Sequence, residues 1–164
     1  MEVRDIKMAF YYDEVNEEGE IVARKVRLLP TTPPLTPGHR WVPWEPTLGE
    51  EKQIKRERIN RDRTYQCVAT IAAEVNGVSY NWQADERSQQ MILASIVLAS
   101  VGVVDVPAVW RTEDNINVPV TLQDLKNIAR AMFLQTNNAF LKSWTLKAML
   151  EQATSISEVE SIQW

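Results

Sequence analysis

The sequence predicts an α+β protein in which a small N-terminal β-hairpin unit precedes a larger, helix-rich domain. Two strand-like runs near the start flank a polar connection that contains Gly19, which is the pattern of a hairpin. Six prolines then fall between residues 29 and 46, where they exclude a helix or a central strand. From residue 47 onward, helix-capping signals precede long helical periodicities. We therefore expect two domains, residues 1–46 and 47–164.

The N-terminal unit is expected to be a hairpin followed by an extended proline-rich linker. Its first strand covers residues 7–12, which are apolar and aromatic, and the polar residues 13–20 supply the turn. The second strand covers residues 21–28. The proline-rich segment should run extended, partly in polyproline conformation, with Trp41 and Trp44 as anchors.

The C-terminal domain is expected to begin with a largely solvent-exposed helix over residues 48–64. Thr47 and Glu50 form a capping box at its start, and the helix has few apolar positions. Two strands joined by Asn76-Gly77 follow, because both turn residues tolerate positive φ. Shorter strand-like runs at 109–112 and 116–118 predict a second hairpin.

Between the two hairpins, Asp85 can cap a helix that runs to about residue 101. Residues 91–99 of this helix are apolar nearly all round. This pattern is typical of a helix at the centre of a core.

The last part of the chain predicts a long C-terminal helix capped by Thr121 and Asp124. Its apolar or small residues recur at intervals of three and four, although residues 135–138 leave room for a kink. They are Leu122, Leu125, Ala129, Met132, Thr136, Ala139, Ser143, Leu146 and Leu150. The pattern leaves open whether this stripe packs within the chain or against a second copy. Ser155 and Glu158 then cap a short helix that ends at Trp164.

Composition predicts a soluble cytoplasmic protein. The net charge is −4, so nothing attracts nucleic acid or anionic lipid globally. The opening residues lack the basic and apolar regions of a secretory signal, and a single cysteine cannot form an internal disulfide. The longest apolar stretch, residues 91–104, is shorter than the roughly 18 residues of a membrane span.

The residues needed for catalysis are scarce. The chain has one histidine, one cysteine and five isolated glycines, and therefore no phosphate loop or imidazole-rich metal site. We expect no enzyme, cofactor, metal or small-molecule substrate. Two alternatives stay open: a Cys67–His39 nucleophilic pair, and Asp85 or Glu86 brought near Asp114 by the fold.

A basic segment over residues 52–63 raises the alternative of nucleic-acid binding. It carries six lysines and arginines against Glu57 and Asp62. Pairs such as Glu51–Lys55 and Glu57–Arg61 favour a solvated helix instead. The aromatic residues lie elsewhere in the sequence, whereas single-strand binders interleave them with basic residues. We therefore expect no nucleic-acid partner.

Several motifs resemble a domain of uncharacterised function that recurs in the tail-fibre gene regions of tailed phages, over about residues 48–164. The matching pattern comprises Ile59-Asn60-Arg61-Asp62-Arg63, Val75-Asn76-Gly77, Trp82-Gln83-Ala84-Asp85-Glu86-Arg87-Ser88, Trp110-Arg111-Thr112-Glu113-Asp114-Asn115, Val118-Pro119-Val120-Thr121, Leu146-Lys147-Ala148 and the closing 155–164 helix. The N-terminal layout, with its Phe10-Tyr11-Tyr12 strand and Pro/Trp segment, is similar to tail fibre assembly proteins.

This resemblance implies a tail fibre assembly chaperone that binds the C-terminal tip of a homotrimeric phage tail fibre, with threefold symmetry. It would act in the host cytoplasm, with retention on the virion left open. The alternative is a permanent structural component of the tail or fibre tip.

The six tryptophans fit a partner-binding protein, because tryptophan is enriched at binding hot spots. We expect the fibre-binding residues in the N-terminal unit. The alternative is that these rings only close the unit's own core. The predicted residues are Phe10, Tyr11, Tyr12, Trp41 and Trp44.

Overall fold

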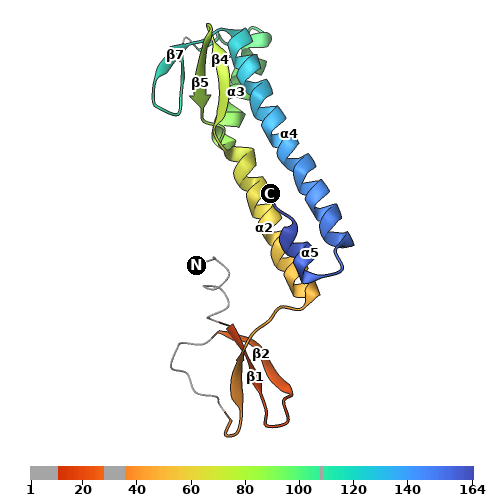
Figure 1. Ribbon diagram of the computed structural model, residues 1–164. Helices are drawn as coiled ribbons and strands as arrows, with labels where there is room; N and C mark the ends of the chain where they lie inside the picture. Colours follow the sequence, from red (N-terminus) through yellow and green to blue (C-terminus); the bar gives the residue numbers. More distant parts are fainter. Residues whose placement is uncertain (1–10, 28–35, 108) are drawn as a thin grey trace. The chain divides into compact units, whose positions relative to one another are not determined.

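The computed structural model describes residues 11–27, 36–107 and 109–164. The chain divides into two compact units, Met1–Glu50 and Glu51–Trp164. The predicted α+β class is confirmed, with small antiparallel sheets and a long helix late in the chain (Figure 1).

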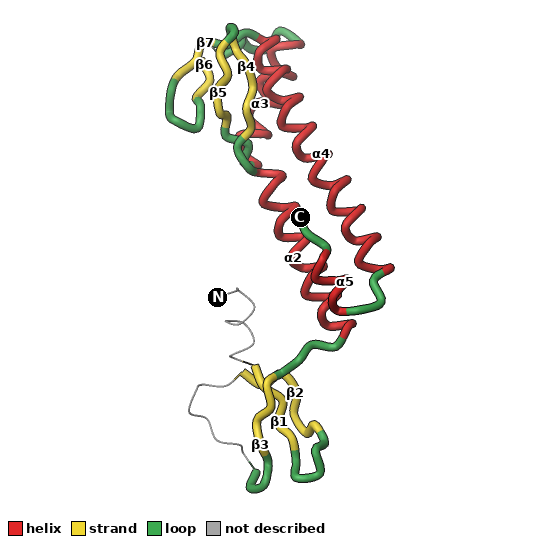
Figure 2. The backbone as a smooth tube through the Cα atoms, in the orientation of Figure 1, coloured by secondary structure: helices red, strands yellow, loops and turns green. Residues whose placement is uncertain are grey.

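The N-terminal unit is a three-stranded antiparallel sheet (Figure 2). The central strand β1 (Tyr11–Val15) pairs with β2 (Ile21–Arg27) on one side and β3 (Arg40–Pro43) on the other. The hairpin is confirmed, although β1 reaches Val15 and residues 7–10 lie outside the described part. The third strand was not predicted: part of the proline-rich segment is extended, as expected, and pairs at the sheet edge, where proline is tolerated.

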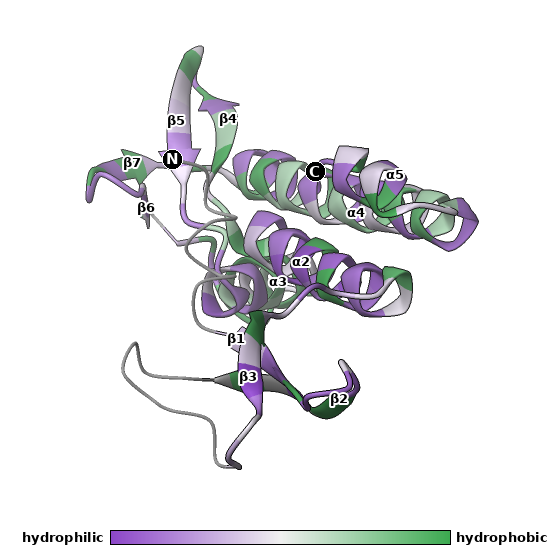
Figure 3. Ribbon diagram, turned by 60° about the horizontal axis from the view of Figure 1, so that its bottom comes forward, coloured by the Kyte–Doolittle hydropathy of each residue, from purple (hydrophilic) through white to green (hydrophobic). Residues whose placement is uncertain are grey.

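Helix α2 (Leu48–Val68), which belongs to the C-terminal unit from Glu51 onward, is about a turn longer than predicted. Its capping box is confirmed: Glu50 Oε2 accepts from the Thr47 N–H at 2.8 Å, and Thr47 Oγ1 accepts from the Glu50 N–H at 3.4 Å. Only Lys55 and Ile59 of this helix are buried, and Figure 3 shows its mostly hydrophilic residues.

Both predicted hairpins are present. Strands β4 (Ile71–Val75) and β5 (Val78–Trp82) meet at Asn76 and Gly77, with φ of 53° and 77°, which is the geometry an Asn-Gly turn supplies. Strands β6 (Val109–Arg111) and β7 (Asn117–Pro119) form the second hairpin. The Glu113 N–H donates to the Asn81 carbonyl at 2.9 Å, which joins the second hairpin to β5.

Three further helices complete this unit: α3 (Glu86–Ser100), α4 (Leu122–Gln152) and α5 (Ile156–Ser161). The predicted caps at Asp85, at Thr121 with Asp124, and at Ser155 with Glu158 are confirmed. The last helix ends at Ser161 instead of Trp164.

No kink interrupts α4 at residues 135–138. The first two of these residues instead contact the end of α2: Gln135 Nε2 donates to the Gln66 and Ala69 carbonyls at 2.9 and 2.6 Å, and the Thr136 hydroxyl donates to the Cys67 carbonyl at 3.5 Å. Such bonds satisfy carbonyls that a helix terminus leaves without a partner. Polar residues inside the α4 pattern therefore cap a neighbouring helix.

The core lies between the hairpins, α3 and α4. Its fully buried members include Trp82, Ile92, Leu125 and Ile128. Burial continues down α4 to Leu150, which resolves the question left open by the sequence: the apolar stripe of α4 packs within the chain.

Candidate partner-binding surface

Helix α3 is apolar on the side that faces solvent as well as on the side that faces the core. Ile92 is fully buried and Ile96 packs against the same core. Opposite them, apolar side chains are between 40% and 67% exposed. They are Met91, Leu93, Val97, Leu98 and Val101. The prediction of a helix at the centre of the core is therefore wrong, because α4 and the hairpins cover only its inner side.

The turn that follows α3 extends this apolar face. Gly102 has φ of +70°, and the Val103 N–H donates to the Leu98 carbonyl at 3.0 Å, which is the Schellman arrangement at a helix end. This bond holds Val103, 66% exposed, and Val104, 44% exposed, next to the last turn of the helix. We call residues 91–104 with their exposed side chains the α3 face.

The α3 face carries no charged residue anywhere between positions 91 and 104. Seven of its large apolar side chains are at least 40% exposed. The largest apolar patch on a typical monomer covers about 300–600 Å² and is often functional. A helix that is apolar all round is normally buried. These two properties make the α3 face a candidate for contact with another macromolecule.

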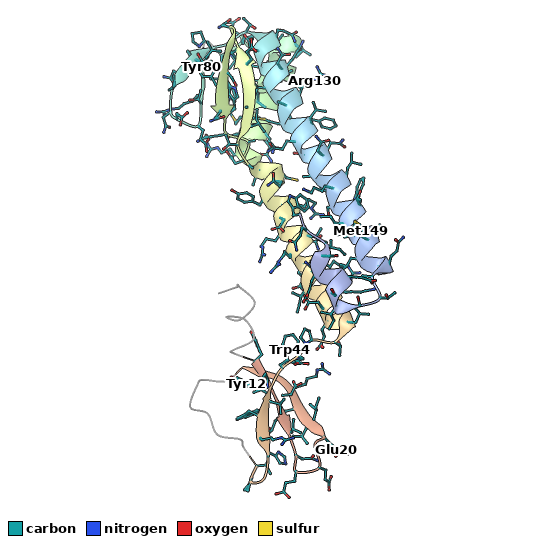
Figure 4. All side chains as sticks on the ribbon, in the orientation of Figure 1. Tyr12, Glu20, Trp44, Tyr80, Arg130 and Met149 are labelled. Carbon is teal, nitrogen blue, oxygen red and sulfur yellow. The ribbon has the colours of Figure 1, made fainter. Side chains whose placement is uncertain are left out.

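The aromatic residues predicted to bind a partner fall on two faces of the N-terminal sheet. Trp44 is only 6% exposed and packs edge-to-face on Tyr11, with ring centroids 6.2 Å apart. Tyr12 precedes Glu14 by two residues, and Glu14 pairs with Trp41, so alternation places Tyr12 and Trp41 together on the opposite face. Figure 4 labels Tyr12 and Trp44. Phe10 lies outside the described residues.

The residues of both catalytic alternatives lie within the described ranges. His39 Nδ1 lies 3.0 Å from Glu14 Oε1 in the N-terminal unit, and Glu14 is buried. Cys67 is half-buried in the C-terminal unit, where its carbonyl accepts from Gln89. Within the described ranges, no three His, Cys, Asp or Glu side chains gather as metal ligands would.

Asp85 is the cap of α3. Its carboxylate accepts from the Ser88 hydroxyl at 2.6 Å and from the backbone N–H groups of Ser88 and Arg87. The Ser88 hydroxyl, more than any other group, lowers the pKa of Asp85 below its ordinary value of 3.8. Glu86 and Asp114, the other acids of the proposed pair, are exposed.

Although the aromatic residues lie elsewhere in the sequence, the fold brings two of them to the basic helix. Arg63 of α2 places its guanidinium carbon 4.9 Å from the centre of the Phe140 ring on α4. Phe140 in turn contacts Trp144, with ring centroids 6.1 Å apart. The sequence did not predict this cluster, because Arg63 and the two rings lie on helices about 80 residues apart in the chain. The i, i+4 spacing of Phe140 and Trp144 on a predicted helix was the available signal.

The fold of the C-terminal unit defines a class: a small α+β domain in which an antiparallel pair, α2 and α4, carries two hairpins and the surface helix α3. A family described as a domain of unknown function, DUF4376, matches residues 50–163, and the chain belongs to this family. No curated protein matches the chain. No solved structure matches it either. None of the helices in the described ranges has the length and apolar character that a membrane crossing needs.

Proposed function

We propose that the protein is a tail fibre assembly chaperone that binds the C-terminal tip of a trimeric phage tail fibre in the host cytoplasm and assists its folding. It acts by binding and turns over no substrate. The observation that carries the proposal is the α3 face, an uncharged apolar surface on an ordered helix.

The physical basis is that a β-rich homotrimer is prone to aggregate before its three chains have paired in register. Unpaired strand edges and apolar side chains are then open to aggregation. A helper with an exposed apolar face can cover such surfaces until the trimer forms. Because the α3 face has no charge to desolvate, covering it costs little on the helper's side.

The N-terminal unit supplies a second set of contacts in this proposal. Tyr12 and Trp41 are half-buried on one face of its sheet and are the rings that we assign to the fibre. Tyr11 and Trp44 support the sheet from the opposite face, since they pack on each other. We divide the four rings in this way because they lie on two opposite faces of the sheet. The role predicted for Phe10 in binding stays a prediction.

Co-expression with the neighbouring fibre chain tests the proposal. The fibre is expressed alone, with the wild-type protein, and with a variant that carries Val97→Lys and Val101→Lys, two positions 59% and 67% exposed. The matched control is Tyr65→Lys, at a residue 69% exposed on α2. We expect fibre trimer and co-elution with the wild type and the control, and loss of both with the double variant.

The result that contradicts the proposal is an equal yield of fibre trimer with and without the protein, and no complex on co-elution. Thermal unfolding of each variant, followed by circular dichroism, shows that the loss is not caused by misfolding. Recovery of the protein at stoichiometric amounts in washed virions would instead indicate a permanent tail component.

A further inference from the structure

A second surface, separate from the α3 face, lies along one side of the α2–α4 pair. The helices run antiparallel: Lys52 Nζ donates to the Glu151 carbonyl at 2.9 Å near one end, and Gln135 reaches the Gln66 carbonyl near the other. Residues four, seven or eleven apart share a helix side. This spacing groups Arg56 and Arg63 on α2, and it groups Phe140, Trp144, Lys147 and Glu151 on α4.

The cations of this surface outnumber its acids. Arg56 forms an ion pair with Glu151. Among the described residues, Arg63 and Lys147 have no carboxylate at ion-pair distance; Arg63 lies over Phe140 instead. Burial, followed by repulsion from Arg63 and Arg56, lowers the pKa of Lys147 below its ordinary value of 10.5. The site therefore carries positive charge that an incoming anion would relieve.

The rings beside these cations are open to a ligand. Trp144 is 59% exposed on a well-formed helix, and Phe140, which supports it, is half-buried. Tryptophan and arginine are the residues most enriched among binding hot spots. An exposed tryptophan beside arginines is more typical of a recognition surface than of a solvated helix face.

We propose that this surface, made by Arg56, Arg63, Phe140, Trp144 and Lys147, binds an acidic segment of a partner polypeptide. Carboxylates of the segment meet the cations, as in the recognition of acidic motifs by arginine clusters. An apolar side chain of the segment packs on Trp144. The proposal is independent of the assembly function, because it uses none of the α3 face.

Charge argues against two other occupants. A second copy in a twofold contact would bring the same cations together, and like charges that face each other across an interface repel. A nucleic acid would need a longer cationic track. Helical spacing puts Arg58 and Arg61 on other sides of α2, about 140° and 160° around the helix from Arg63 at 100° per residue. The net charge of −4 also repels a polyanion.

Titration of the full-length protein with short synthetic peptides tests the proposal, followed by calorimetry and by tryptophan fluorescence. One peptide alternates glutamate with phenylalanine, a second has glutamine at every glutamate position, and the third probe is an oligothymidylate of similar length. Arg63→Ala and Trp144→Ala are compared with Arg61→Ala, an exposed arginine of the same helix.

We expect the glutamate peptide to bind at least about tenfold more tightly than the glutamine peptide. Arg63→Ala and Trp144→Ala should each weaken that binding about tenfold, and Arg61→Ala should leave it unchanged. Equal binding of the two peptides, or equal loss with Arg61→Ala, overturns the proposal. So does tighter binding of the oligothymidylate, or a dimer that Trp144→Ala dissociates in sedimentation.

Discussion

At the scale of single residues, Lys55 of the basic segment is buried, although its sequence context predicts a solvated helix. Lys55 is 5% exposed, and its Nζ donates to the carbonyls of Ile162 and Glu160 at 2.9 and 3.3 Å. A buried ammonium is tolerated only where such acceptors replace water. Lys55 therefore fastens the end of α5 and the residue that follows it to the first half of α2, in a helix expected to be mostly solvated.

Replacing this lysine should loosen the C-terminal end. Lys55→Met keeps the aliphatic stem but removes the ammonium donor from both carbonyls, of which Glu160's still accepts from Gln163 Nε2. We therefore expect a loss of about 1–3 kcal/mol in unfolding free energy. Hydrogen exchange should rise first in α5. The control is Arg58→Met at an exposed position of α2; an equal loss in both variants would contradict the assignment.

The carboxylate that caps α5 predicts a dependence of stability on pH. The Thr154 N–H, then the Thr154 hydroxyl, and more weakly the Ser155 N–H, lower the pKa of Glu158 below its ordinary value of 4.5. The unfolded chain then binds this proton more readily, so the stabilisation is present above pH 4.5 and is lost as pH falls through the folded pKa.

Glu158→Gln should accordingly be less stable than the wild type at neutral pH, with the difference shrinking below pH 4.5. Urea unfolding at a series of pH values measures this difference. A difference that is the same at every pH would show that the charge of the cap has no part in it.

At the scale of elements, α3 shows that an apolar helix need not be buried on every side. Its inner side reaches the core through Ile92, whereas its outer side carries Val97 at 59% exposure. A helix pattern without a polar side cannot tell whether one side or both are covered, because hydropathy is the same for an interface as for a core.

Two truncations on this helix should therefore differ sharply. Ile92→Ala removes packed atoms and leaves a cavity, for a loss of about 2–5 kcal/mol. Val97→Ala removes atoms already in water, and its effect should stay within about 0.5 kcal/mol. Chemical denaturation measures both. A comparable loss at Val97 would mean that another part of the chain covers the α3 face.

At the scale of the whole molecule, the capping box of α2 should affect the stability of the C-terminal unit as an isolated fragment. The compact unit begins at Glu51, yet Thr47 and Glu50 satisfy the first amides of α2. We expect a fragment of residues 47–164 to fold and to be about 0.5–2 kcal/mol more stable than a fragment of residues 51–164. Circular dichroism during urea unfolding checks this; equal stability would show that the cap contributes nothing.

Much of the fold could be predicted from the sequence because its signals are local. Capping residues, the Asn76-Gly77 turn and the three-and-four spacing of α4 act within a few residues, so the helices, both C-terminal hairpins and the apolar stripe of α4 were predicted in their places. The burial of this stripe within the chain was not predicted. The N-terminal hairpin was predicted for the same reason, although residues 7–10 of its first strand lie outside the described residues.

The features that could not be predicted from the sequence depend on contacts between segments that are distant in the chain. The pairing of β3 with β1, the outward apolar side of α3, the burial of Lys55 and the meeting of Arg63 with Phe140 all join segments whose spacing in the chain carries no signal. Local sequence determines which helix or strand forms, through backbone hydrogen bonds and side-chain period. Which side of each element stays in water is set by the neighbours it meets, and the candidate binding surfaces lie on those exposed sides.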